Sequence, residues 1–288
     1  MSVRLIAMDV DGTLLNSAGI VTEEVKSAFR EASAAGIHLA LATGRVRAEC
    51  EPLLRQLPEL THMVNCTGAS VYDIRRARVL YSNFIPMDLV REIYLRLLPI
   101  PCQFEVMADG VVYCEAETFE AMTASYPDGH LEYYMETLRT TRTPVDLKKM
   151  LREHEEPATK LHMFFRDPAD SLRAEALVAD LGMLVLRSVP ENLEINMPDV
   201  NKGVGLRALA ESLKIPRESV MAIGDNLNDA GMLEYAGCPV VVANANPAVL
   251  PLARYRTRSN DDSGVAYAIR SVLDGTLENL RIAKEERT

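Results

Sequence analysis

Short apolar runs followed by helical patterns recur in the first part of the chain. Residues 3–8 (VRLIAM) and 37–43 (IHLALAT) are apolar at nearly every position, and a third strand is predicted near 61–66. Such runs are typical of parallel strands buried on both faces. Apolar residues at helical spacing predict helices over 22–35 and 46–56. A parallel sheet covered by helices is therefore expected.

The same pattern resumes after Pro198, so both ends of the chain are expected to build one core. Its predicted elements are a helix over 201–213, a strand over 220–225, a helix over 227–236, a strand over 239–244, and helices near 247–253 and 262–273.

The middle of the chain has a different pattern, in which adjacent strands are joined by short turns. After a polar-turned hairpin over 70–81, we predict a helix over 88–98, a hairpin around 108–110, helical stretches between 117 and 154, strands over 159–165, 184–188 and 192–197, and a helix over 169–181. This mixture indicates an antiparallel sheet that carries helices on one face. The predicted fold class is α/β, a doubly wound, Rossmann-like parallel-sheet core at residues 1–82 and 199–288 with an inserted α+β domain at residues 83–198.

Composition and charge narrow the class of protein. The 288 residues are 48% hydrophobic and carry a net charge of -10, which argues against a nucleic-acid partner because a polyanion needs a basic face. No apolar run approaches the roughly 18 residues needed to span a bilayer, so no membrane partner is expected. The first residues have the pattern of a buried strand and not of a signal peptide. Five cysteines without a C-x-x-C pair favour a reducing cytoplasm.

Two aspartates end the first predicted strand. Asp9 and Asp11, in MDVDGTLL, lie at the carboxyl end of that strand, where open α/β sheets bind ligands. Positions i and i+2 of an extended segment face the same side, so both carboxylates can point into one crevice. Adjacent carboxylates repel each other unless a cation joins them, and Mg²⁺ prefers oxygen ligands. An ordinary Asp-Gly turn is the alternative interpretation.

Two further places in the pattern carry groups suited to a phosphoryl anion. Thr43, Gly44 and Arg45 follow the second strand and offer a hydroxyl, backbone N–H groups and a cation. Lys202 opens the helix after the insertion, where a cation opposes the helix dipole and therefore needs another reason, such as an anionic partner. Taken singly, each could be a turn or a surface residue.

The segment GDNLND follows the strand over 220–225 and adds two acids and two amides. Asp225 and Asp229 are four residues apart at the start of a helix, so they could share a face and hold a metal, and Asn226 and Asn228 lie between them. One of the acids could instead cap the helix. The occurrence of all these groups at successive strand ends of one chain favours a site over turns and caps.

Together these motifs resemble the haloacid dehalogenase superfamily of phosphatases. The matching motifs are D-x-D-G-T (Asp9–Thr13), A-T-G-R (Ala42–Arg45), N-K-G (Asn201–Gly203) and G-D-N-x-N-D-x-x-M (Gly224–Met232). Their order and spacing are similar to the Cof-type branch, which carries a large α+β cap between the second and third motifs, and the closing stretch VVVANANPAVLPLARYRTRSNDDSGVAYAI is similar as well. One departure is Thr67-Gly68-Ala69, where the branch often has Asn-Gly-Ala, and this change would alter substrate contacts in that loop.

The resemblance implies a Mg²⁺-dependent phosphatase that works through an aspartyl-phosphate. Asp9 would be the nucleophile, and Asp11 the general acid and then the general base. Mg²⁺ would be held by the Asp9 carboxylate, the Asp11 backbone carbonyl and Asp225. Asp229 would be a ligand through water, or a brace paired with Lys202.

The resemblance also implies which residues bind the phosphoryl group. Thr43, Lys202, Asn228 and the N–H groups around Asp11 and Gly44 would spread its charge. Arg45 would contact the rest of the substrate or form a structural salt bridge.

The expected substrate is a small phosphorylated metabolite, with sugar phosphates foremost. The cap would close over the crevice and select the leaving group, although its candidate residues Phe104, Tyr113, Glu115, Tyr133 and Tyr134 are better interpreted as packing residues. Two alternatives stay open: a phosphotransferase or phosphomutase that uses the same intermediate, and a metabolite-binding regulator without turnover. A monomer is favoured, with a weak homo-oligomer as the alternative.

Overall fold

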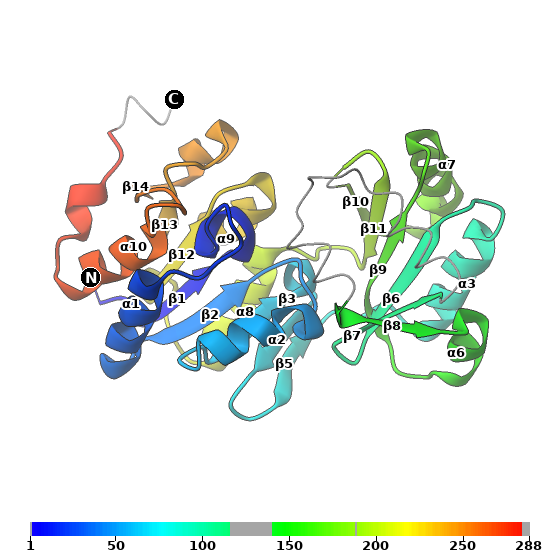
Figure 1. The fold of residues 1–288 in the computed structure, drawn as a ribbon, viewed down its shortest axis with the longest axis horizontal. Coiled ribbons are helices and arrows are strands. Elements are labelled where there is room, and N and C mark those ends of the chain that lie inside the picture. Colours follow the sequence, from blue (N-terminus) through cyan, green and yellow to red (C-terminus); the bar gives the residue numbers. More distant parts are fainter. Residues whose placement is uncertain (1, 116–139, 188, 284–288) are drawn as a thin grey trace. The chain divides into compact units, whose positions relative to one another are not determined.

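The computed structural model describes residues 2–115, 140–187 and 189–283, and these form two compact units. The first unit is built from the chain up to Arg45, from Cys50–Ser82, and from the chain from Asn201 onward. The second is built from Val46–Glu49 and Asn83–Val200, so the division falls within one helix, α2 (Arg47–Gln56). The labels of Figure 1 are used below.

An eight-stranded sheet forms the centre of the first unit, in the order β14-β13-β12-β1-β2-β3-β4-β5. Every pair from β14 to β3 is parallel, as the apolar runs predicted. The predicted hairpin is confirmed as β4 and β5, which extend the sheet in antiparallel fashion. The strands are β1 (Leu5–Met8), β2 (His38–Ala42), β3 (His62–Asn65), β4 (Ser70–Asp73), β5 (Arg78–Ser82), β12 (Val220–Gly224), β13 (Cys238–Val241) and β14 (Tyr255–Arg256).

Helices cover both faces of this sheet. Leu5 and Ala7 of β1 join the hydrophobic cluster formed with α8 and α9, while the alternate residues Ile6 and Met8 are equally buried on the other side. Helices α1 and α10 pack against each other. The helices are α1 (Glu23–Ala34), α8 (Lys202–Ser212), α9 (Ala230–Tyr235) and α10 (Gly264–Leu273), and α9 follows a 3-10 turn at Leu227–Asp229. The stretch predicted as a helix near 247–253 is a 3-10 turn, Pro247–Leu252.

The second unit is a six-stranded sheet in the order β10-β11-β9-β6-β7-β8, with helices on one face. Phe104, Leu161 and Ile195 belong to the cluster that joins the sheet to the helices. The elements are α3 (Met87–Leu97), β6 (Gln103–Ala108), β7 (Val111–Glu115), β8 (Arg142–Val145), α6 (Leu147–Glu153), β9 (Ala158–Phe164), α7 (Pro168–Val178), β10 (Leu184–Leu186) and β11 (Asn192–Asn196).

Two expectations about the second unit were wrong in detail. Residues 142–145 lie in the range predicted to be helical but form β8, and β8 pairs in parallel with β7, so the sheet is mixed and not purely antiparallel. The side chain of Arg142 explains the local choice, because it is buried in ion pairs with Glu105 and Glu49 that fix this segment against the sheet edge.

The candidate cap residues pack within the second unit, as expected. Phe104 packs edge-on against Tyr94, Tyr113 lies beside His154, and the Glu115 carboxylate accepts a hydrogen bond from the Leu147 backbone N–H. Tyr133 and Tyr134, and the helical stretches expected before residue 140, lie outside the described residues. None of the described helices is long and apolar enough to cross a membrane.

Candidate active site

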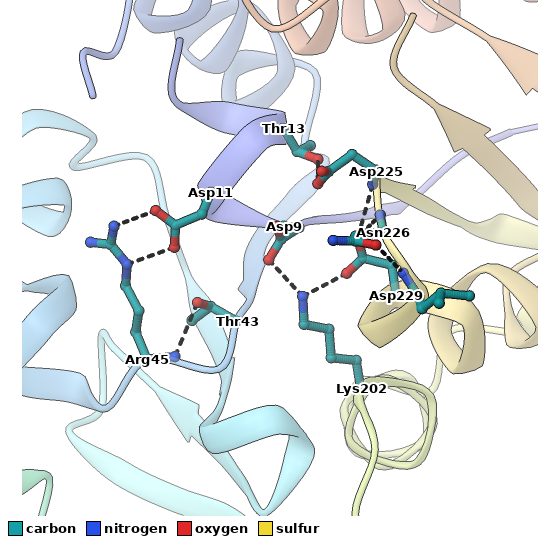
Figure 2. Close-up of polar contacts among 10 residues, drawn as sticks. Asp9, Asp11, Thr13, Thr43, Arg45, Lys202, Asp225, Asn226 and Asp229 are labelled. Carbon is teal, nitrogen blue, oxygen red and sulfur yellow. Dashed lines mark hydrogen bonds and ion pairs between the residues drawn. The ribbon is translucent and has the colours of Figure 1, made fainter. Parts of the chain in front are cut away.

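The carboxyl ends of three adjacent strands bring the predicted site residues together (Figure 2). Asp9 follows β1, Thr43 follows β2, and Asp225 follows β12, which lies on the other side of β1. The Asp9 backbone N–H continues the parallel pairing by donating to the Ile223 carbonyl at 2.9 Å. The sheet therefore fixes where these side chains begin.

Lys202 joins two carboxylates inside the protein. Its Nζ lies 2.6 Å from Asp9 Oδ1 and 2.5 Å from Asp229 Oδ1, and the side chain is fully buried. Burial alone would lower the pKa of the ammonium, but Asp9 and Asp229 together outweigh burial and raise the pKa above its ordinary value. Lys202 is therefore a permanent cation at the first position of α8, where its two anionic partners offset the helix dipole.

Asp9 is buried, and other acidic side chains lie close to it. Burial raises the pKa of its carboxyl well above the ordinary value, Lys202 opposes this, and Asp229 and Asp11 add to it. Burial also raises the pKa of Asp225, against a hydrogen bond from Thr13. One lysine does not neutralise this group of acids.

Asp229 supports its neighbours through both carboxylate oxygens. Its Oδ2 accepts from the backbone N–H groups of Asp225 (2.9 Å) and Asn226 (3.1 Å), while Oδ1 faces Lys202. Asp229 and Asn226 form a capping box at the 3-10 turn. The capping interpretation and the brace interpretation of this acid therefore both hold.

The acids fit a hard divalent cation. Ligand oxygens of Asp9, Asp225 and Asp229 all lie within 4.8 Å of one another. Carboxylate oxygens are the ligands that Mg²⁺ prefers. Burial first, and neighbouring acids second, raise the pKa values of Asp9 and Asp225 by disfavouring their charged forms, and a bound cation would stabilise those charged forms. Because both oxygens of Asp229 already accept hydrogen bonds, Asp9 and Asp225 are better placed as direct ligands.

Asp11 faces away from this cluster. Its carboxylate binds the Arg45 guanidinium through both oxygens, at 2.9 Å from Nε and 2.5 Å from Nη2 (Figure 2). The Asp11 side chain is 60% exposed, so it stays open to solvent despite the ion pair. Arg45 forms the salt bridge that was one of its two expected roles, and its partner is Asp11.

The remaining predicted residues line the same edge. Thr43 is buried, and its Oγ1 accepts from the Arg45 backbone N–H at 3.2 Å. Gly44 separates these two residues, and Asn228 is exposed in the turn before α9. The hydroxyl of Thr43 keeps its own proton available to an anion.

Thr13 is part of the first motif, but the sequence alone indicates no role for it. Its Oγ1 donates to Asp225 Oδ1 at 2.8 Å, which joins the loop after β1 to the loop after β12. Gly12 makes this approach possible: its φ is +82°, and a Cβ there would lie 2.6 Å from Asp225 Oδ2. The signal that could have indicated this role of Thr13 is the D-x-D-G-T motif, which ends in this glycine and this threonine.

The loop after β3 carries the departure noted above. Thr67 has φ +60° and ψ 18°, the left-handed region that β-branched residues rarely adopt. Its backbone N–H donates to the Thr43 carbonyl at 3.0 Å, and a Cβ at Gly68 would lie 2.0 Å from the Asn201 carbonyl oxygen. The loop is thus fixed between Thr43 and the start of α8.

Comparison with known proteins shows the family of the chain. Residues 6–269 match the haloacid dehalogenase-like hydrolase family. The chain belongs to this family. YcsE of Bacillus subtilis, a 5-amino-6-(5-phospho-D-ribitylamino)uracil phosphatase, is 28% identical over 274 residues, 94% of this chain and 96% of its own. YbhA of Escherichia coli, a pyridoxal phosphate phosphatase, is 28% identical over 281 residues, 95% of this chain and 100% of its own.

A solved structure agrees in fold as well. A haloacid dehalogenase-like hydrolase from Bacteroides thetaiotaomicron superimposes with a TM-score of 0.81 at 26% identity, over 94% of this chain and 100% of its own. The predicted fold class and the resemblance to this family are confirmed, and the expectation of a phosphatase agrees with the names of the relatives.

Proposed function

We propose that the protein hydrolyses phosphate monoesters of small metabolites through a phosphoryl group carried on Asp9. The observation that carries the proposal is the contact of Asp9 with Lys202, which leaves a buried carboxylate oriented by a permanent cation within a cluster of acids. A binding protein has no need of a nucleophile in this position, so the regulator alternative is disfavoured.

In the first half-reaction, an Asp9 carboxylate oxygen attacks phosphorus and the bond to the leaving oxygen breaks. Asp11 takes part in its protonated form, with the oxygen that carries the proton released from Arg45, and it donates that proton to the leaving oxygen, so the alcohol leaves neutral. Lys202, the Thr43 hydroxyl, the Asn228 amide and the Gly44 N–H would donate to the phosphoryl oxygens. Arg45 acts on Asp11 by fixing the orientation of its carboxylate.

In the second half-reaction, water attacks the aspartyl-phosphate and Asp11 accepts the proton of that water. The bond between phosphorus and Asp9 breaks, which regenerates the carboxylate and releases inorganic phosphate. Mg²⁺, held by Asp9, Asp225 and the Asp11 backbone carbonyl, would neutralise phosphoryl charge in both steps. The hydrogen bonds that the Asp229 carboxylate accepts from the backbone N–H groups of Asp225 and Asn226 keep the Asp225 loop in place.

The substrate class follows from the relatives. Their printed activities are on phosphate esters of a ribitylamino compound and of pyridoxal, which are small and polar. We therefore infer a small phosphorylated metabolite for this chain too, with sugar phosphates as the first compounds to test.

Purified protein with Mg²⁺ and an aryl phosphate tests the proposal. We expect release of inorganic phosphate that stops with a chelator and in Asp9→Asn. The matched control is Asp88→Asn on α3, an exposed aspartate outside the site, which should behave like wild type. Activity that survives in Asp9→Asn, or that ignores the chelator, contradicts the proposal. A second alcohol added as acceptor separates hydrolysis from phosphotransfer.

A further inference from the structure

Two asparagines far along the chain hold the loop that carries Asp9 and Asp11. Asn244 Nδ2 donates to the Gly12 carbonyl at 2.8 Å, and Asn260 Nδ2 donates to the Leu15 carbonyl at 2.9 Å. The two are joined to each other, because the Asn260 backbone N–H donates to Asn244 Oδ1 at 2.9 Å. The loop after β1 is therefore held at two carbonyls by one connected set of hydrogen bonds.

The same segment also holds the loop that carries Asp225. Two residues after Asn244, the Asn246 backbone N–H donates to the Asp225 carbonyl at 2.8 Å. The Asn246 side-chain amide lies 3.3 Å from Asn226 Oδ1. Residues 244–246 thus contact both loops whose carboxylates form the acid cluster.

The order of the strands explains why such a connection is needed. The segment follows β13, and β12 lies between β13 and β1. Asn244 therefore reaches past the end of β12 to the loop after β1. The two loops also contact each other directly, because the Thr13 hydroxyl and Gly12 both lie against the Asp225 carboxylate. These two contacts involve the Asp225 side chain and not the backbone of its loop. Asn244 binds the backbone of the loop after β1, and Asn246 binds the backbone of the loop after β12. Neither asparagine occupies a carboxylate oxygen of the acid cluster in these hydrogen bonds.

We propose that Asn244 and Asn260 are positioning residues that fix the Asp9 loop against the Asp225 loop, and so set the affinity of the acid cluster for Mg²⁺. The proposal rests on the proposed function for the identity of the cation. The hydrogen bonds of Asn260 are in part buried, so water does not readily replace them. Groups that orient metal ligands typically change metal affinity by about 10- to 100-fold when removed.

The contact of Asp261 with Ser17 offers a matched control. Asp261 Oδ1 and Oδ2 accept from the Ser17 backbone N–H at 2.7 Å and from its hydroxyl at 2.8 Å. This pair ties the same two segments together, and like the Asn244–Gly12 hydrogen bond it is exposed, but it lies beyond Leu15. Asp261→Ala therefore loses a connection of similar kind without releasing the part of the loop that bears Asp9 and Asp11.

Calorimetric titration of the full-length protein with Mg²⁺ tests the proposal without turnover. We expect Asn244→Ala and Asn260→Ala to bind Mg²⁺ about tenfold or more weakly than wild type, and Asp261→Ala to bind as wild type does. The Mg²⁺ concentration for half-maximal phosphate release should rise in parallel, with a larger loss in kcat than increase in KM at saturating Mg²⁺.

Asn244→Asp keeps the test decisive if an alanine variant does not fold. It retains the oxygen that accepts from Asn260 and loses the N–H that donates to Gly12, while its added negative charge would by itself attract a cation. Weaker Mg²⁺ binding in this variant supports positioning. Wild-type affinity in the asparagine variants, or an equal loss in Asp261→Ala, overturns the proposal alone. A wild-type protein that binds no Mg²⁺ overturns the metal site of the proposed function together with it.

Discussion

The Arg45 guanidinium binds both carboxylate oxygens of Asp11, at 2.9 Å from Nε and 2.5 Å from Nη2. Such a bidentate pair fixes a carboxylate in direction as well as in place. Asp11 is thereby separated from Asp9, Asp225 and Asp229, whose oxygens gather around one point. Two aspartates that are two residues apart in sequence therefore have different surroundings, which suits a nucleophile and a proton-transfer group.

Arg45→Lys should lower kcat more than it changes KM. A lysine keeps the charge but cannot bind both oxygens, so Asp11 loses its fixed orientation. We expect a loss of about 10- to 100-fold in kcat, measured by steady-state phosphate release. Arg30→Lys on the exposed face of α1 is the control. An increase in KM with unchanged kcat would show instead that Arg45 binds substrate.

Lys202→Met should destabilise the protein as well as abolish activity. The substitution leaves Asp9 and Asp229 buried without their shared cation, and breaking such a pair costs about 3–5 kcal/mol. Denaturant unfolding without Mg²⁺ measures this loss. Lys148→Met, at an exposed position of α6, should change little. An unfolding free energy equal to that of wild type in Lys202→Met would mean that the buried ion pairs are not formed.

Thr67→Asn should stabilise the loop after β3. Asparagine adopts the left-handed region more readily than a β-branched residue, and the backbone there has φ +60°. We expect the free energy of unfolding to rise by about 1 kcal/mol. Thr67→Ala, which removes the branched side chain without the preference of asparagine, should gain less. Destabilisation in Thr67→Asn would show that the threonine side chain makes a contact worth more than the strain.

Acid should destabilise the second unit through His162. Burial lowers the pKa of this imidazole to about 4, partly opposed by Glu194. In the unfolded chain the group titrates near its ordinary value of about 6.5, so between these two values the unfolded state binds the proton and the folded state does not. Stability is therefore lost as pH falls from 7 towards 5.

The expected loss from this one group is about 2 kcal/mol at pH 5 relative to pH 7. Unfolding free energies at both pH values, for wild type and His162→Gln, isolate it, because other titrating groups such as His62 are common to the two proteins. His162→Gln should lose less stability on acidification. Equal losses would show that His162 does not control this dependence.

The sequence predicted the sheet, the parallel direction of its strands and the place of the acids at the strand ends, because buried apolar runs and strand ends are local signals. Lys202 is an example: its position against the helix dipole favours an anionic partner over a surface position, and the structure provides Asp9 and Asp229. For Arg45 the sequence does not distinguish a substrate contact from a salt bridge. Pairing with Asp11 depends on the approach of two loops, which no local pattern encodes.

Long-range contacts account for the other omissions. The hydrogen bonds of Asn244 and Asn260 to the first loop join residues more than 200 positions apart, so no local pattern predicts these contacts. Strand β8 was missed because its four residues are held by the buried Arg142, whose acidic partners come from elsewhere in the unit. A monomeric state and a cytoplasmic location stay predictions.

The most direct test of the account is peptide mapping by mass spectrometry after an acid quench of turnover. In Asp11→Asn, which removes the base for the second half-reaction, the phosphorylated form should accumulate with a good leaving group such as an aryl phosphate. We predict one phosphoryl group on Asp9, in the peptide that contains residues 5–26, and none in Asp9→Asn. A phosphoryl group on any other residue, or turnover without a covalent phosphate on Asp9, would contradict the account.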